Sequence, residues 1–110
     1  MSLTLRTTLG CTEAVIDDDG GLKRFYQVAD ILTDSLHLNF DNKEDDFDTI
    51  DWVFNYQGQS LTLHYNIYTG VSIFPAKTRE ALKKANKAVV ELANTITDKL
   101  FRQESTRRIA

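Results

Sequence analysis

Asp51 and His64 are the two residues whose types and predicted positions could do acid–base chemistry. Residues 50–56 and 61–67 alternate between apolar and polar types, which predicts two strands. A two-residue turn at Gln57-Gly58 would join the strands in a register that sets Asp51 directly opposite His64. A carboxylate in that position could orient an imidazole as a general base. The sequence places no serine or cysteine beside them as a nucleophile, and cross-strand ion pairs are common on exposed sheet faces, so we expect a surface pair.

Other groups that could hold a metal ion or a cofactor lack the required spacing. His37 is expected on the same sheet face as His64, but two strand spacings, ~10 Å, would separate them, which is too far for one zinc ion. The acidic segment 41–48 lacks the central glycine and the final glutamate of a calcium loop. No glycine-rich phosphate-binding motif occurs. The sequence therefore predicts no catalytic residue, no metal site and no cofactor.

The remaining polar and exposed residues predict a surface for a partner. Segment 41–48 is expected to be an acidic loop between strands, either simply solvated or facing a basic protein surface. Tyr68 and Phe74 point outward in the predicted register, and an outward phenylalanine near a sheet edge suggests an apolar contact. The predicted interaction surface consists of Asp41, Glu44, Asp45, Asp46, Asp48, Asp51, His64, Tyr68 and Phe74.

The first half of the chain is predicted to contain a strand, a helix and a second strand. Residues 3–9 alternate and predict a strand, which residues 11–16 extend or return. The aspartates at 17–19 are expected to cap a following helix. Its apolar stripe consists of Leu22, Phe25, Ala29, Leu32 and Leu36, widened by Val28 and Ile31. At residues 36–40 the period changes to two, which predicts a strand with Leu36, Leu38 and Phe40 on one side.

The second half is predicted to continue as a meander and to end in a long helix. A three-residue loop, Tyr68-Thr69-Gly70, would pair Tyr65 with Ile73, and Pro75 would end that strand. Thr78 is a candidate N-cap for the last helix. The apolar stripe of that helix consists of Leu82, Ala85, Val89, Leu92, Ala93, Ile96 and Leu100.

The predicted fold class is α+β, with an antiparallel β-meander of four to five strands and two helices packed on one face. One helix lies on the N-terminal side and the long one is C-terminal. We expect a single domain over residues 1–110, with residues 103–110 as a frayed tail. The uncovered face should be polar and should carry His37, Asn39, Asp51, Asn55, Thr62, His64 and Asn66.

Charge and cysteine usage narrow the classes of function. Residues 1–75 hold twelve acidic and four basic side chains, whereas residues 76–110 hold nine basic and four acidic ones. The acidic balance argues against nucleic acid as a partner, although the final helix carries lysines. Cys11 is the single cysteine and no apolar run approaches membrane-spanning length, so we expect a cytoplasmic protein with no membrane partner.

These features predict a small non-enzymatic protein-binding or regulatory module, such as an inhibitor or a chaperone-like protein. Its partner would be another protein or a second copy of the chain, and a small-molecule ligand stays undefined. The alternative is a small enzyme or ligand-binding domain that uses the polar sheet face around Asp51 and His64. In outline only, the order helix, strands, helix with an acidic balance resembles small bacterial binding modules such as secretion chaperones and toxin-immunity proteins.

Overall fold

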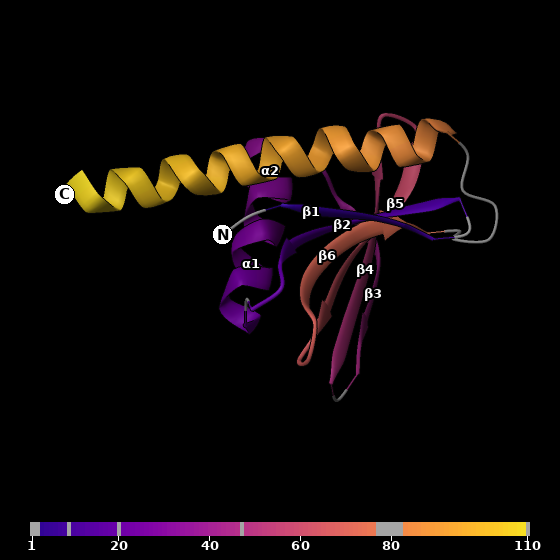
Figure 1. Cartoon of the computed structure of the whole chain (residues 1–110), viewed down its shortest axis with the longest axis horizontal. Helices are drawn as coiled ribbons and strands as arrows, with labels where there is room; N and C mark the ends of the chain where they lie inside the picture. Colours follow the sequence, from indigo (N-terminus) through magenta and orange to yellow (C-terminus); the bar gives the residue numbers. More distant parts are fainter. Residues whose placement is uncertain (1–2, 9, 20, 47, 77–82, 110) are drawn as a thin grey trace.

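The computed structural model has an α+β fold in which a six-stranded antiparallel sheet is covered by two helices (Figure 1). It describes residues 3–8, 10–19, 21–46, 48–76 and 83–109. In chain order the elements are β1 (Thr4–Thr8), β2 (Cys11–Asp17), α1 (Leu22–Asp30), the π-helical turn η1 (Ile31–Ser35), β3 (Phe40–Asp45), β4 (Thr49–Tyr56), β5 (Gln59–Asn66), β6 (Gly70–Pro75) and α2 (Lys83–Ile109). The predicted fold class is confirmed, with six strands in place of four to five.

The sheet is a four-stranded meander extended by an N-terminal hairpin. The strand order is β1-β2-β6-β5-β4-β3, and every neighbouring pair is antiparallel. Residues 11–16 therefore return the first strand, and the β1–β2 hairpin pairs with the free side of β6. This order leaves β1 and β3 as the two edge strands of the sheet.

The β4–β5 hairpin has the register that the sequence predicted. Phe54 pairs with Leu61, Trp52 with Leu63, and Asp51 with His64. The turn residues Gln57 and Gly58 have φ angles of 52° and 80°. Two central residues with positive φ define the type I′ turn, whose twist matches that of the flanking strands.

The β5–β6 turn differs from the prediction by two residues in register. The loop consists of Ile67, Tyr68 and Thr69, so Tyr65 pairs with Val71 and not with Ile73. Gly70 has a φ of 84° and lies at the start of β6, where an added Cβ would be only 2.0 Å from the main-chain oxygen of Asp17. This glycine is required by the close approach of β2, a contact that the local sequence does not reveal. A shift of two residues keeps each side chain on its predicted face.

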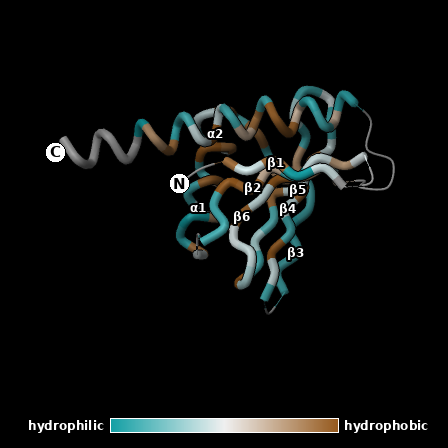
Figure 2. The backbone as a smooth tube through the Cα atoms, in the orientation of Figure 1, coloured by the Kyte–Doolittle hydropathy of each residue, from teal (hydrophilic) through white to brown (hydrophobic). Residues whose placement is uncertain are grey.

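The core lies between one face of the sheet and both helices. It joins inward residues of β2, β4, β5 and β6 to the stripes of α1 and α2 in a single cluster. Figure 2 shows hydrophobic and hydrophilic positions alternating along α2. Asn86 ties α2 to the first hairpin: its Nδ2 donates to the Gly10 carbonyl (2.6 Å), and its Oδ1 accepts from the Thr12 amide (3.0 Å). Of the predicted stripe residues, Leu22 is half exposed and Leu82 lies outside the described residues, as does the predicted N-cap Thr78.

Two local predictions around the first helix are wrong. Gly21 is the N-cap of α1 and no side chain caps the helix; instead, Asp17 accepts a hydrogen bond from Nε of Arg24 (3.0 Å). The predicted strand at residues 36–40 is irregular up to Phe40. The amides of Leu36 and Leu38 donate to carbonyls of η1, to Ile31 (3.1 Å) and Leu32 (2.9 Å), so they are not free to pair in a sheet.

The long helix α2 extends beyond the sheet that it covers (Figure 1). The helix backbone continues to Ile109 and projects past α1 in Figure 1, and the frayed tail expected for residues 103–110 stays a prediction. Among the described helices, none combines the length and apolar character needed to cross a bilayer.

Candidate functional site

The acidic segment forms an edge strand rather than the loop that the sequence predicted. Asp41, Glu44 and Asp45 lie within β3, which pairs on one side with β4 and has no strand on the other. Charged side chains are poor strand formers, but they are tolerated on an edge because they stay in water. All side chains from Asp41 to Asp46 are exposed. The strand is held by its pairing with β4 and by Phe40, whose ring packs on Trp52 and Phe54.

On its free side, β3 presents main-chain groups that have no partner strand among the described residues. The amide of Asp46 donates to the carbonyl of Thr49 (2.8 Å), so the main-chain groups of Asp46 face β4. In an antiparallel ladder, alternate residues face the partner strand and the residues between them face away. The main-chain N–H and C=O groups of Lys43 and Asp45 therefore point away from the sheet.

On the helix-covered face, β3 is attached to the core through Trp52. The indole Nε1 donates to Oδ1 of Asp45 (2.7 Å), and Nζ of Lys43 lies 4.3 Å from the centre of the indole ring. Phe25 and Phe40 pack edge-on against the same indole, each at 5.0 Å between ring centres. Trp52 is buried, as predicted. Because Lys43 and Asp45 of β3 contact its indole ring, the fluorescence of Trp52 should respond to changes at this edge strand.

On the uncovered face, one row of side chains crosses three strands. Glu44 of β3 pairs with Asp51 of β4, which pairs with His64 of β5. Nδ1 of His64 lies 2.5 Å from Oδ1 of Asp51, so the predicted pair is confirmed. The ring of Phe74 lies beside the imidazole, 5.4 Å between centres. The row places two carboxylates side by side and one imidazole at its end.

This row borders a solvent-open hollow of about 430 Å³ on the uncovered face. Thr62 belongs to its lining and is only 5 % exposed. Its hydroxyl forms no hydrogen bond with any described residue, and its oxygen is reached by solvent, because no buried side-chain nitrogen or oxygen among these residues lacks a partner. The lining residues are Asn42, Glu44, Asp51, Val53, Thr62, His64, Phe74 and Ala76. The uncovered face therefore has a shallow, open depression beside this row of side chains.

The structure brings together only part of the predicted surface. Glu44, Asp51, His64 and Phe74 line the hollow, whereas Tyr68 lies on the β5–β6 loop and is 79 % exposed. Asp45 turns toward Trp52 on the other face. Asp41, Asp46 and Asp48 are absent from the lining; the Asp48 carbonyl accepts from the amide of Ile67 (3.2 Å). His37 and Asn39 precede β3 and take no place in the sheet, so their predicted position on this face is wrong.

Sequence reasoning placed Thr62 on this face but left it out of the interaction surface, and it missed Asn42, Val53 and Ala76. Val53 could have been found, because it shares the alternation that places Asp51 and His64 on one face. Asn42 could not, because its segment was expected to be a loop.

Known proteins offer no guide to this site. No family model, no curated protein and no solved structure matches the chain.

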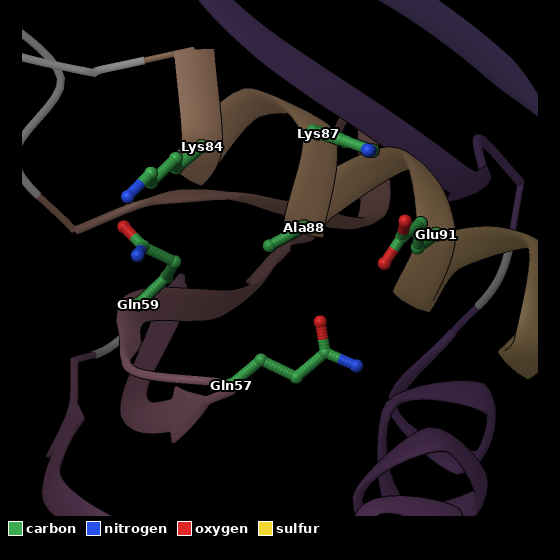
Figure 3. A pocket seen from close by; sticks show the side chains of 6 residues that line it. All are labelled: Gln57, Gln59, Lys84, Lys87, Ala88 and Glu91. Carbon is green, nitrogen blue, oxygen red and sulfur yellow. The ribbon is translucent and has the colours of Figure 1, made fainter.

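A second, smaller depression of about 200 Å³ lies between the β4–β5 turn and α2 (Figure 3). Its lining consists of Gln57, Gln59, Lys84, Lys87, Ala88 and Glu91. In Figure 3, Lys84 and Gln59 point toward one another across it. Burial, and secondarily the charge of Glu91, raise the pKa of the neighbouring Tyr56 phenol. Its exposed lysines and its glutamate carry opposite charges, so this depression favours neither an anion nor a cation.

Cys11 is half-buried at the start of β2 and has weak nucleophilic character. Burial, and then the negative charge of Glu13, raise the pKa of its thiol above the ordinary value. Because the thiolate is the reactive form, these surroundings suppress its chemistry.

Proposed function

We propose that this protein is a binding module that takes up an extended, basic segment of a protein partner along the edge strand β3. One observation supports the proposal above all: the most acidic stretch of the chain is an edge strand with main-chain groups of Lys43 and Asp45 turned outward. An added strand gains affinity from main-chain hydrogen bonds and specificity from side chains that alternate between the two faces.

The charge of β3 selects the kind of strand that can be added. Asp41, Glu44 and Asp45 would face like charges if a second copy of β3 paired with this one, and like charges placed opposite each other destabilise a sheet. A basic strand would instead meet opposite charges. Lys43, the one cation of this strand, already lies over Trp52. A homodimer of the kind predicted from the sequence would therefore use another surface, such as β1, which holds Arg6 and no acidic residue.

The alternative, a small enzyme or ligand-binding domain, draws support from the hollow around His64. Among the described residues, its lining includes no serine or cysteine, and Asp51 occupies one ring nitrogen of the imidazole. Acyl or phosphoryl transfer through an activated nucleophile lacks its usual parts here. The hollow therefore favours binding over catalysis.

The proposal is tested with capped peptides in which arginine or glutamate alternates with threonine. Calorimetry should detect binding of the arginine peptide, weakened by salt, and none of the glutamate peptide. An arginine peptide N-methylated at alternate residues should bind at least about tenfold more weakly, because it lacks the N–H groups that pair with β3. Equal binding of the methylated and unmethylated peptides would show that no strand is added.

Matched charge variants locate the binding edge. Asp41→Lys with Asp46→Lys reverses two exposed charges at β3, and Asp30→Lys with Asp34→Lys makes the same change in net charge on the first helical segment. The first variant should weaken the arginine peptide about tenfold through two lost attractions and two new repulsions. The second should have little effect. Equal effects of the two variants would mean that overall charge, and not β3, attracts the peptide.

The proposal includes a cytoplasmic location. A single cysteine with a suppressed thiol suits a reducing compartment. An intermolecular Cys11 disulfide in protein whose thiols are alkylated at the moment of cell lysis would argue against it.

A further inference from the structure

We infer that the hollow on the uncovered sheet face is a subsite for an arginine guanidinium group, here named the guanidinium subsite and defined by Glu44, Asp51, Thr62, His64 and Phe74. The identification of the arginine as part of a partner's extended segment rests on the proposed function. The chemistry of the subsite does not, because it follows from the groups that line the hollow.

The two carboxylates of the subsite leave a place for a cation. Glu44 and Asp51 are directly opposite each other on β3 and β4, an arrangement of like charges that destabilises a sheet by itself. Asp51 has the imidazole of His64 at 2.5 Å. Within the described part of the chain, no lysine or arginine forms an ion pair with Glu44, whose recorded polar contact is the Nδ2 of Asn42 at 3.4 Å. A guanidinium between the carboxylates would replace repulsion with attraction.

The hydroxyl of Thr62 offers the subsite a hydrogen-bond acceptor that no described residue occupies. Thr62 is more than nine-tenths buried, lines the hollow and makes no side-chain hydrogen bond within the described residues. Among the described residues, no buried side-chain nitrogen or oxygen lacks a hydrogen-bond partner, so the Thr62 oxygen is reached by the solvent of the hollow and is open to a ligand there. An N–H group of a guanidinium can donate to its oxygen.

The aromatic rings favour a guanidinium over a metal ion or an anion. Phe74 and His64 present neighbouring rings at the border of the hollow. Planar guanidinium groups stack on such rings, which compact ammonium groups and metal ions cannot do in the same way. The described residues include no cluster of three metal-ligating side chains, and the two carboxylates would repel an anion.

Strand geometry connects the subsite to the edge of β3. Side chains on an added strand alternate between faces, so a residue beside Glu44 extends over the uncovered face. Strands lie about 4.8 Å apart, which places Asp51 about 10 Å from the added strand. An extended arginine side chain covers most of this distance and can reach the space between Glu44 and Asp51. The partner segment should therefore need arginine at this position, with freer choice at the positions on either side.

The test uses a probe that cannot form a strand: N-acetyl-arginine N-methylamide, compared with its neutral citrulline counterpart. NMR titration of the protein should show saturable shifts at Thr62, His64 and Phe74 with the arginine probe, and much smaller shifts with citrulline. Glu44→Gln should weaken the arginine probe about threefold to fivefold, as for loss of one solvent-accessible ion pair. Asp46→Asn, which removes an exposed charge beyond the hollow, is the matched control and should leave the affinity unchanged.

A conservative pair of variants tests the hydroxyl. Thr62→Ser keeps the oxygen and should keep the affinity, whereas Thr62→Val keeps the shape and should weaken the probe at least about threefold. Equal shifts with arginine and citrulline, or equal affinities of the serine and valine variants, would overturn the assignment. If the arginine probe does not bind the hollow while the unmethylated arginine peptide still binds more tightly than the methylated one, the guanidinium subsite is wrong and strand addition at β3 stands. If the probe binds the hollow but methylation of the peptide has no effect, strand addition is wrong and the subsite stands.

Discussion

Gly70 is the residue whose replacement tests the packing of β2 against β6 most sharply. An alanine Cβ there would lie 2.0 Å from the main-chain oxygen of Asp17 and 2.8 Å from the main-chain carbon of Asp18. These are backbone atoms, so no side-chain rotation relieves the overlap. Gly58 is the matched control, because its φ of 80° is close to the 84° of Gly70 and an added Cβ would meet nothing within 4 Å.

Both substitutions should lower the free energy of unfolding through backbone strain, and only Gly70→Ala should lower it further through a steric overlap. A residue other than glycine in the left-handed region loses about 1–2 kcal/mol, and both variants should lose this much. Gly70→Ala must also move the end of β2 by more than 1 Å to reach an ordinary 3.4 Å contact, which breaks the pairing of Asp17 with Val71. With lost ladder hydrogen bonds of about 1 kcal/mol each and the loosened packing around them, we expect a total loss of about 3–5 kcal/mol.

Urea unfolding followed by the fluorescence of Trp52, the single tryptophan, measures both losses. The expected result is a small decrease in the midpoint for Gly58→Ala and a decrease at least twice as large for Gly70→Ala. The slope of the transition should stay the same in both. Equal decreases for the two variants would refute the close approach of β2 to Gly70.

Three further perturbations have defined outcomes. Iodoacetamide should modify Cys11 more slowly than a free cysteine at the same pH, because burial and Glu13 raise the pKa of the thiol. Glu13→Gln should speed the reaction, and full unfolding of the protein should speed it further. Trp52→Phe should lower the free energy of unfolding in urea by about 2–3 kcal/mol, because it removes the hydrogen bond to Asp45, some packing and the cation–π contact with Lys43. A loss under about 0.5 kcal/mol would contradict the anchoring of β3 by Trp52. Asp51→Asn should cost no more than about 1 kcal/mol, since the pair with His64 lies on an accessible face; a loss above 3 kcal/mol in the same assay would show a buried structural role instead.

The parts of the fold that the sequence predicted are those with agreeing local signals. In the β4–β5 hairpin, the alternation of side chains and the Gln57-Gly58 turn select the same register, so the pair Asp51–His64 could be placed from the sequence. The burial of the α2 stripe followed from helical periodicity in the same way. Both patterns depend on residues that are close in the chain.

The parts that were wrong depend on contacts between distant segments. Residues 41–45 contain charges without alternation, and only pairing with β4 makes them a strand. Residues 36–40 do alternate, but η1 uses the main-chain amides that a strand would need. Glu44 therefore could not be placed beside Asp51, and the hollow could not be foreseen. The low exposure of Thr62 and its place in the hollow depend on neighbouring strands that its own segment does not specify.

Amide hydrogen exchange at Lys43 and Asp45 tests the central claim most directly, because the N–H groups of these two residues point away from the sheet on the free side of β3. Addition of a saturating basic peptide should slow exchange at both amides at least about tenfold, while the amide of Asp46, already bonded to Thr49, should change little. Bound peptide with unchanged exchange at Lys43 and Asp45 would contradict the claim that β3 accepts an added strand.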